Sequence, residues 1–403
     1  MQILSKPYSV QRGQPKPEQG RNVIREEQVM KKKAVAAGQI CIDITPVFPE
    51  ETRRVGSLGE ILLPGKLVSI GKPDIHTGGA VANTGLGMKA LGVDTRLVGK
   101  VGNDEFGRMV KGILDESGAG DDLMMDSDSI TSYTIVLAAP GIDRIFLHCS
   151  GANDSFTGEE VSDEILDGAA LFHFGYPTVM RQMYAEDGRN LEALFSHVSS
   201  MGIATSLDMA AVDKDSEAGE ADWEKILERT LPFVDFFVPS FEELCFMLDR
   251  PRFERLQVMS RAAGGDVTKA MDIDSDVRPL AEKCLAMGAK AVLLKCGAPG
   301  MFLETSGSME KAGSRIDLDT EEWNDFCAFE RSYRIKKVLS GTGAGDTSIA
   351  AFLTSILEGY GPREALQNAV AEGALCCTAY DAISGLKNLD EIRSMISSGW
   401  SKA

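Results

Sequence analysis

The stretch SGTGAGDTSIAAFLTSIL, residues 340–357, places three glycines within five residues directly before a run of small and apolar residues. The apolar residues that follow Asp346 recur at helical spacing, so we expect a helix to begin here. Because glycine lacks a Cβ, the backbone can bend until successive N–H groups point at one spot, which the positive end of the helix dipole also faces. The stretch therefore predicts an anion-binding loop that needs no lysine.

Asp346 immediately follows these glycines and has two interpretations. It can cap the helix, or it can be the base that takes the proton of a hydroxyl group beside the anion-binding loop. The same four letters, GAGD, also occur at residues 118–121, where the following residues show no helical period. We expect that copy to be the end of a helix, with glycine in the left-handed conformation and no catalytic role.

Composition limits the classes of partner. The 403 residues carry a formal net charge of -18, so a nucleic acid or an anionic membrane surface would be repelled. The eight cysteines follow no metal-binding or disulfide spacing. The first residues hold no apolar signal core, and no apolar run is long enough to span a bilayer, so the sequence predicts a cytoplasmic protein without nucleic-acid or membrane partners.

Strand and helix patterns alternate along most of the chain. Residues 1–33 are polar and aperiodic, and we expect them to form a flexible N-terminal tail. From residue 34 to about residue 400, short apolar runs alternate with amphipathic helices. This predicts one α/β domain with a mostly parallel central sheet flanked by helices. Its first strand is expected in the apolar run AVAAGQICIDI, residues 34–44.

Three segments break this alternation. Those at about 44–77 and 131–152 have hairpin-like patterns without helices between them, and we expect them to pair into a small separate β-sheet. The segment 304–335 is polar and irregular, and we expect it to be an excursion on the surface.

A second glycine-rich site opens a helix at residues 77–83, TGGAVAN. Gly78 and Gly79 would expose backbone amides at the helix start, and the Asn83 side chain offers both a donor and an acceptor, which suits recognition of hydroxyl groups. A tight turn with a helix cap is the structural alternative. Asp43 lies at the carboxyl end of the first predicted strand, where ligands of parallel α/β sheets bind.

The two glycine-rich sites together resemble those of the ribokinase-like (PfkB) carbohydrate kinase family. The chain has neither a Walker A loop nor a dinucleotide-binding fingerprint that would indicate another phosphate-binding design. GTGAGDTSIAAFL at 341–353 and GGAVANTGLGMKALGVDTRLVGKVGNDEFG at 78–107 carry the resemblance, which covers about residues 34–400. It implies a ribokinase-like fold in which the two helix-free segments form a β-sheet lid, and a kinase that uses ATP and Mg2+.

The resemblance also implies roles for individual residues. Asp346 would be the catalytic base, and the anion hole would comprise Gly343, Ala344 and Gly345. The residues that would bind the substrate are Asp43, Gly78, Gly79, Asn83 and Asn153. The residues that would bind the nucleotide are Lys295, Gly297, Gly300 and Thr342, and Glu243 would act indirectly on the metal.

Two departures from the family pattern are visible. The family commonly has an asparagine three residues before the glutamate that is linked to magnesium; here Glu243 is retained and the asparagine is Ser240. The family often has an aspartate in a monovalent-cation site at the position that Ser340 occupies here. A serine does not supply the anionic ligand, so we expect weak or absent activation by potassium.

The sequence predicts an ATP-dependent kinase of a small sugar, with a neutral monosaccharide favoured. Ala80 and Val81 stand in the sugar-binding motif where a cation would be needed to accept a charged sugar. Cations elsewhere keep a phosphosugar or a sugar acid as alternatives; they are Arg53, Arg54, Lys72 and Arg144 in the lid, and Arg181 after a core strand.

Two further alternatives remain. A nucleoside kinase of the same fold would stack its base on aromatic side chains such as Phe48, Phe172, Phe174 and Tyr176. A sugar-binding regulator without turnover belongs to another class of protein, and the retained Asp346 argues against it. The expected partners are a small-molecule sugar, ATP and a second copy of the chain, which would bind through the lid.

Overall fold

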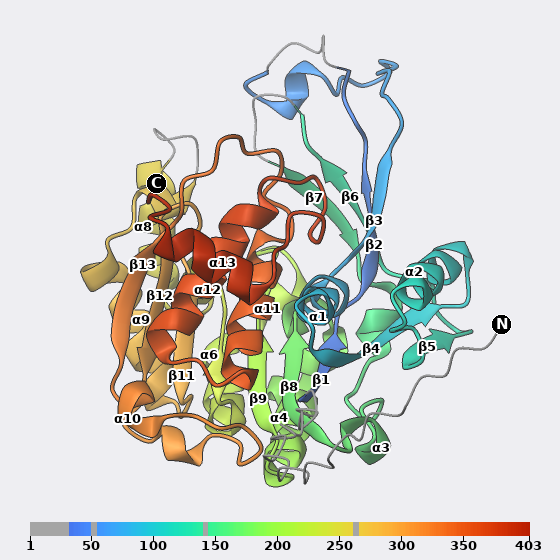
Figure 1. Cartoon of the computed structure of the whole chain (residues 1–403). Coiled ribbons are helices and arrows are strands. Elements are labelled where there is room, and N and C mark those ends of the chain that lie inside the picture. The colour runs from blue at the N-terminus through green and yellow to red at the C-terminus, as the bar shows by residue number, and fades with distance from the viewer. Residues whose placement is uncertain (1–31, 50–54, 140–143, 261–265) are drawn as a thin grey trace, which may run out of the picture. The chain divides into compact units, whose positions relative to one another are not determined.

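The computed structural model describes residues 32–49, 55–139, 144–260 and 266–403. Within these ranges the larger sheet has nine strands in the order β13-β12-β11-β10-β9-β8-β1-β4-β5 (Figure 1). Neighbouring strands are parallel except β11 with β12 and β12 with β13, which confirms the predicted mostly parallel sheet. The strands are β1 (Lys33–Gly38), β4 (Asp94–Gly102), β5 (Leu123–Asp126), β8 (Ala169–Gly175), β9 (Ala204–Asp208), β10 (Phe236–Phe237), β11 (Ala291–Lys295), β12 (Gly300–Thr305) and β13 (Cys327–Arg331).

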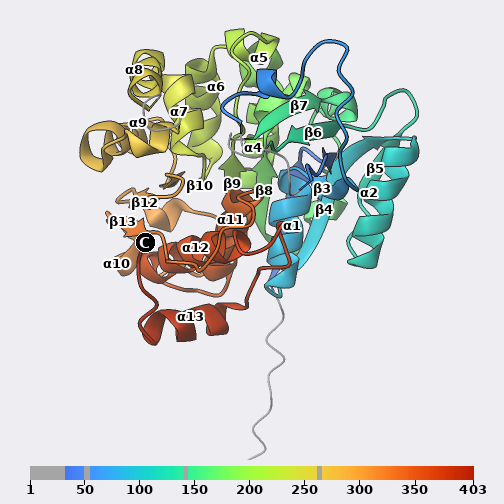
Figure 2. The same cartoon turned by 90° about the horizontal axis from the view of Figure 1, so that it is seen from above.

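Helices cover both faces of this sheet (Figure 2). Side chains alternate between the two faces along each strand, so Phe236 and Phe237 enter different apolar cores. The core that contains Phe237 is closed by α4 (Arg181–Ser200), α6 (Trp223–Thr230), α7 (Phe241–Leu248) and α9 (Arg278–Ala286). The core that contains Phe236 is closed by α1 (Ala80–Ala90), α11 (Ala344–Leu357), α12 (Pro362–Cys376) and α13 (Leu389–Ser397). The remaining α-helices are α2 (Glu105–Glu116), α3 (Asp163–Leu166), α5 (Glu217–Glu220), α8 (Arg250–Ser260) and α10 (Thr320–Trp323).

The two helix-free segments do pair into a second sheet, as predicted. Its four described strands lie in the order β3-β2-β6-β7, with β2 antiparallel to β3 and parallel to β6. The strands are β2 (Cys41–Thr45), β3 (Asp74–Gly78), β6 (Tyr133–Leu137) and β7 (Ile145–Cys149). Arg53 and Arg54, two of the lid cations, lie outside the described residues.

The apolar run 34–44 forms two strands, so the prediction of a single strand is wrong. β1 belongs to the larger sheet and β2 to the small one. Between them Gly38 has a φ of 123°, and a Cβ at this position would lie 2.3 Å from the carbonyl oxygen of Gly175 in β8. Only glycine allows this close approach and the turn from one sheet into the other. Asp43 therefore pairs with His76 inside the small sheet and does not end a strand of the larger one.

The structure also changes two other predictions, one about segment 304–335 and one about the end of the N-terminal tail. The segment 304–335 is not merely an irregular excursion, because it contributes β13 to the sheet edge and buries Trp323 completely against the rings of Phe236 and Phe352. The predicted tail lies outside the described residues up to residue 31, and Lys33 already begins β1. Across the described ranges, no helix combines the length and apolar character needed to cross a membrane.

Candidate active site

A cavity of about 940 Å³ lies between the two sheets. Residues that follow β1, β8, β9 and β10 line one part of it, and side chains of β2, β6 and β7 line another. In parallel sheets the carboxyl ends of the strands meet at one edge, which is where such folds place their ligands. The cavity brings together both glycine-rich motifs and the loop that follows β11.

The glycine loop before α11 forms the start of a helix, as the sequence predicts. Gly343 is the N-cap of α11 with φ 76°, and a Cβ there would lie 2.4 Å from the Cβ of Ala382. Conformation and packing both require glycine at this position. Gly343, Ala344 and Gly345 line the cavity, so the N–H groups of the first turn, which have no acceptor within the helix, lie at its wall; that of Ala344 donates to the carbonyl oxygen of Gly341 at 3.3 Å. This arrangement suits a bound anion.

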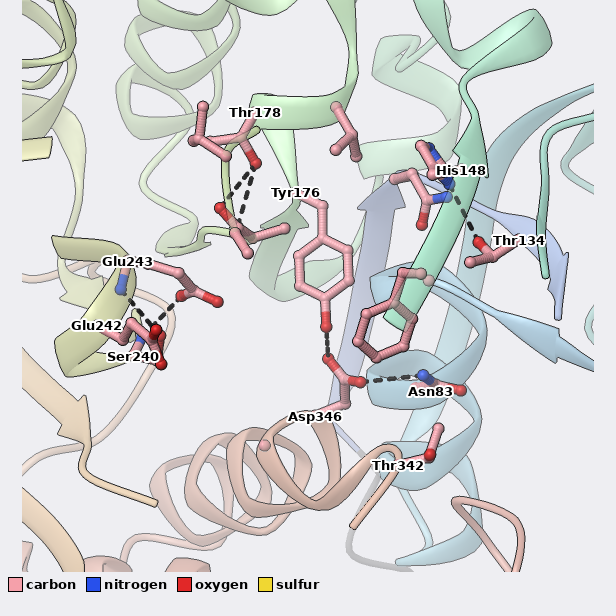
Figure 3. Close-up of a pocket in the computed structure, with 18 of the residues that line it drawn as sticks. Asn83, Thr134, His148, Tyr176, Thr178, Ser240, Glu242, Glu243, Thr342 and Asp346 are labelled. Atoms are coloured by element: carbon pink, nitrogen blue, oxygen red, sulfur yellow. Dashed lines mark hydrogen bonds between the residues drawn. The ribbon is translucent and has the colours of Figure 1, made fainter. Parts of the chain in front are cut away.

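Asp346 lies in the first turn of α11 with only 4% of its surface exposed. The side-chain nitrogen Nδ2 of Asn83 donates a hydrogen bond to Asp346 Oδ2 at 2.9 Å. The hydroxyl of Tyr176 donates to Asp346 Oδ1 at 2.5 Å, so the two partners reach the carboxylate from α1 and from the end of β8 (Figure 3). The first glycine-rich motif and the last therefore meet at one carboxylate.

Asp43 lies in the wall of the same cavity, on β2. Burial raises the pKa of its carboxyl group, and hydrogen bonds from Cys41 and Thr134 oppose this shift. Gly78 ends β3 and does not line the cavity, whereas Gly79 is the N-cap of α1 and does. A Cβ on Gly78 would lie 2.3 Å from the Asp43 carboxylate, and one on Gly79 would lie 2.0 Å from the side-chain oxygen of Gln39.

Asn153 is placed differently from the sequence prediction. It is fully buried, and its amide donates to the carbonyl oxygens of Ile40 at 3.0 Å and Ser150 at 3.1 Å. Its amide oxygen accepts a hydrogen bond from the N–H of Ile40 at 3.3 Å. Among the described residues that line the cavity Asn153 does not occur. The side chain fixes the backbone between β1 and β2, which leaves its polar atoms engaged with the protein.

A buried ion pair forms another part of the cavity. Lys295, at the end of β11, donates through Nζ to Asp208 Oδ1 at 2.6 Å, and the Asp208 side chain is completely buried. Burial raises the pKa of Asp208, and the Lys295 ammonium group opposes this shift. Burial alone would lower the pKa of Lys295, but Asp208 and Glu243 raise it, so the ammonium group stays charged. A Cβ on Gly345 would lie 3.8 Å from Lys295 Nζ, which places this cation beside the anion-binding loop.

Glu243 has a structural role as well as a place in the cavity wall. It forms a capping box at the start of α7, in which Ser240 Oγ accepts from the Glu243 N–H and Glu243 Oε2 accepts from the Ser240 N–H at 2.9 Å. Serine is a favoured N-cap residue, so Ser240 fits the start of α7. Burial raises the pKa of Glu243, while the charge of Lys295 lowers it.

The predicted nucleotide-binding residues divide into two groups. Thr342 and Gly297 line the cavity, and Thr342 Oγ1 accepts a hydrogen bond from Arg144 of the lid at 2.5 Å. Gly300 has a φ of 140° at the start of β12, where a Cβ would lie 2.0 Å from the carbonyl oxygen of Glu330. Its glycine is required by strand pairing, and Gly300 is absent from the described residues that line the cavity.

Three other expectations are decided by where the structure places the residues concerned. Arg181 does not reach inward, because its guanidinium pairs with Glu217 at 2.9 Å on the surface. Gly118 follows α2 with a φ of 61°, and Asp121 is exposed, which confirms that the second GAGD is a helix end. Phe172 and Phe174 are fully buried in the core and cannot stack on a ligand in the cavity.

Sequence reasoning missed Tyr176, which lines the cavity, and Asp208, which does not line it but pairs with Lys295 of the cavity wall. Asp208 is an acid at the carboxyl end of a buried strand, the same signal that was used for Asp43, and that signal could have found it. Tyr176 was considered only as a stacking residue, because nothing local in the sequence shows that its hydroxyl meets a residue 170 positions away.

Comparisons with known proteins agree with this geometry. The pfkB family carbohydrate kinase model matches residues 32–389. An uncharacterized sugar kinase from Archaeoglobus fulgidus is 25% identical over 306 residues, which cover 75% of this chain and 98% of that protein. Fructokinase-1 from Zea mays is 27% identical over 331 residues, covering 79% and 88%. The structure of Arabidopsis thaliana ribokinase complexed with ribose and ATP matches with a TM-score of 0.65 at 19% identity, covering 92% of this chain and 100% of that chain.

Proposed function

The chain belongs to the PfkB family of carbohydrate kinases and is a sugar kinase, and we propose that it transfers the γ-phosphoryl group of ATP to a hydroxyl of a neutral monosaccharide. The observation that carries this proposal is the position of Asp346. A buried carboxylate lies in the first turn of α11, directly after a glycine loop that lines the cavity, and contacts Asn83 of the other glycine motif.

In this proposal Asp346 takes the proton of the attacking sugar hydroxyl. The N–H groups at Gly343, Ala344 and Gly345 stabilise the negative charge that spreads over the transferred phosphoryl group. The reaction needs little covalent chemistry from the protein, because phosphoryl transfer is accelerated mainly by positioning and charge neutralisation. A carboxylate beside a helix N-terminus provides both.

The nucleotide would be held at the end of the cavity that Thr342, Gly297 and Lys295 line. The ATP in the similar ribokinase structure supports ATP as the donor. Lys295 supplies the cation that the glycine loop itself lacks, since its ammonium group lies beside Gly345. A lysine in this position can contact the transferring phosphoryl group as a point charge.

Magnesium would arrive with ATP. Within the described ranges no group of three or more His, Cys, Asp or Glu side chains could hold a metal ion. Mg2+ is usually held by phosphates and water with one or two carboxylates, and Glu243 is in position to act through water. Asp208 does not line the cavity, but its buried Oδ2 atom has no partner among the described residues and would accept a hydrogen bond from a water of the hydrated ion. When bound, the ion would neutralise phosphate charge during transfer.

The charge of the cavity supports a neutral substrate. Its sugar-binding end contains Asp43, Asn83, Thr134 and neutral or polar neighbours, and the acidic Asp346 lies next to Asn83. Of the lysines and arginines that the structure describes, only Arg144 and Lys295 line the cavity, and each contacts another protein group. A phosphosugar would bring additional negative charge that these two residues would have to neutralise.

An ADP-release assay would test the function. The purified chain is incubated with ATP and Mg2+ and one acceptor at a time: ribose, fructose, a nucleoside, fructose 6-phosphate or 2-keto-3-deoxygluconate. We expect turnover with a neutral sugar and none with the same sugar for Asp346→Asn. Turnover with only the charged acceptors or only the nucleoside would reject the neutral-sugar assignment, and Arg144 would then be the first residue to mutate.

We also propose that two copies associate through the lid. β7 is an edge strand among the described strands of the small sheet. Its Ile145 and Leu147 are exposed, and its exposed Phe146 lines the cavity. An exposed apolar edge is a ready site for pairing with another chain. Light scattering on a sizing column should give a dimer that Leu147→Lys converts to monomer, whereas Val258→Lys, at an exposed apolar residue of α8, should remain a dimer. A monomeric parent protein would reject the proposal.

A further inference from the structure

Both oxygens of the Asp346 carboxylate are occupied by hydrogen-bond donors of the protein itself. Asn83 donates to Oδ2 and Tyr176 donates to Oδ1. A base that accepts the proton of a sugar hydroxyl must offer one of these oxygens to that hydroxyl. Each carboxylate oxygen can accept two hydrogen bonds, so a protein donor leaves one acceptor position on its oxygen and competes with the substrate hydroxyl for the space beside it.

The two donors differ in how easily each can move away from the Asp346 carboxylate. Asn83 lies inside α1 and is 92% buried, and its helix packs between β1 and α11. Tyr176 follows the end of β8 and is only partly buried, with its side chain in the cavity wall. Its backbone has φ 68° and ψ 43°, a left-handed conformation that is uncommon for a bulky residue. Such a conformation persists where the surroundings determine it, and it is often found at functional sites.

The backbone of Tyr176 is held on both sides. Its N–H donates to the carbonyl oxygen of Asp208 at 3.1 Å, and its own carbonyl accepts from the N–H of Val179 at 3.2 Å. The left-handed conformation thus belongs to an ordered turn, which directs the phenol ring at Asp346 (Figure 3). Only rotation about the side-chain bonds is needed to move the hydroxyl away from Oδ1.

We propose that the Tyr176 hydroxyl occupies the place of the acceptor hydroxyl on Asp346 Oδ1 while no sugar is bound, and that it thereby suppresses the hydrolysis of ATP. The inference rests on the proposed role of Asp346 as the base. Both hydroxyls are single donors to the same oxygen, so the sugar replaces the tyrosine without a change in the number of hydrogen bonds to the carboxylate.

The suppressed reaction is the hydrolysis of the terminal phosphoryl group of ATP. Water would attack the γ-phosphorus while its proton passes to Asp346, and the bond from that phosphorus to the β,γ-bridging oxygen would break, releasing ADP and inorganic phosphate. With Tyr176 donating to Oδ1 from the cavity wall, its hydroxyl holds the position beside this oxygen that an attacking water would need. Burial and the charge of Asp346 raise the pKa of Tyr176 well above its ordinary value, so the phenol remains a donor and does not replace the base.

The test is phosphate release from ATP and Mg2+ without any sugar, measured for the full chain and for Tyr176→Phe. A hydrogen bond to a charged group corresponds to about ten- to a hundredfold in an equilibrium, so we expect sugar-independent hydrolysis to rise by about tenfold or more. The KM for the sugar should fall, because the sugar no longer displaces the phenol. Tyr360→Phe is the matched control: its hydroxyl accepts a hydrogen bond from Arg393 at 3.2 Å outside the cavity, and hydrolysis should be unchanged.

The double variant Tyr176→Phe with Asp346→Asn separates the possible causes. The added hydrolysis should disappear in it; if the hydrolysis survives, the water is not activated by Asp346 and the inference is wrong. A Tyr176→Phe variant with unchanged hydrolysis and a lower kcat would show that the phenol serves transfer itself, which also overturns the inference. Failure of the parent protein to phosphorylate any sugar would count against the proposed function, so the two failures can be told apart.

Discussion

Asn83 Nδ2 lies 2.9 Å from Asp346 Oδ2, although 263 positions separate the two residues in the chain. The contact joins α1 to α11, the two helices that begin with glycine-rich motifs. The helices approach closely because their facing residues are small: a Cβ on Gly87 would lie 2.9 Å from the Cβ of Ala350. This packing fixes the carboxylate in the cavity wall before any ligand arrives.

The first prediction concerns this contact. Asn83→Ala removes one of the two hydrogen bonds that orient Asp346, and a bond to a charged group contributes about 1.5–3 kcal/mol. We expect kcat to fall by about ten- to a hundredfold in steady-state assays. Asn103→Ala, at an exposed asparagine outside the cavity, should retain full turnover. Normal kcat in Asn83→Ala would show that the orientation of Asp346 does not depend on α1.

The second prediction tests whether Asn153 has a structural role or contacts the sugar. Asn153→Ala leaves the buried N–H and carbonyl of Ile40 without their side-chain partner. Each unsatisfied buried group costs roughly 1–3 kcal/mol, so urea denaturation should show a loss of at least that size. The KM for the sugar should change little in the folded fraction. Unchanged stability with a strongly raised KM would instead favour a direct contact with the sugar.

The third prediction tests the buried ion pair. Lys295→Met leaves the Asp208 carboxylate unpaired in the interior, and breaking a buried pair typically costs about 3–5 kcal/mol. Turnover should also fall, because the cation beside the anion-binding loop is lost. In the double variant Lys295→Met with Asp208→Asn, we expect stability to recover and turnover to stay low. Recovery of both would limit Lys295 to a structural role.

The fourth prediction concerns pH. Glu372 on α12 is buried, its Oε1 accepts from the Lys387 N–H at 2.9 Å, and burial raises its pKa to about 8. Between the unfolded pKa near 4.3 and this value, the unfolded state binds fewer protons than the folded state. Stability should therefore fall as the pH rises from about 4.3 to about 8, with a slope of at most ~1.4 kcal/mol per pH unit from this group.

Glu372→Gln cannot ionise and should reduce this slope. The measurement is the free energy of unfolding in urea at several pH values for both proteins. Other buried acids contribute to the same trend in both, so the difference between the proteins isolates Glu372. Parallel curves over this range would mean that Glu372 ionises in the folded protein as it does in the unfolded chain.

The sequence correctly predicted those features of the fold that local patterns determine. Helix α11 and the left-handed Gly118 were predicted correctly, because helical spacing and glycine at a helix end are local signals. The division of residues 34–44 was not predicted, since the need for glycine at Gly38 comes from the backbone of Gly175, which is distant in sequence.

The atoms that side chains of the site face could not be predicted for a similar reason. Asn153 follows the lid in sequence, but only the fold shows that its amide is used by Ile40. Tyr176 has a hydroxyl whose partner is determined by the fold, which brings the residue after β8 beside the first turn of α11. A single sequence gives the residue types at such positions and not the atoms they face, which depend on long-range packing.

The measurement that tests the central claim most directly is sugar-dependent ADP release by Asp346→Asn beside Asp121→Asn. The two aspartates close identical GAGD stretches, but only Asp346 is buried at the start of a helix in the cavity wall. Loss of a positioned base costs on the order of 10²–10⁴-fold, so Asp346→Asn should lose that much of kcat with little change in the Kd for the sugar, and Asp121→Asn should retain full activity. Near-normal turnover by Asp346→Asn would contradict the assignment of Asp346 as the base.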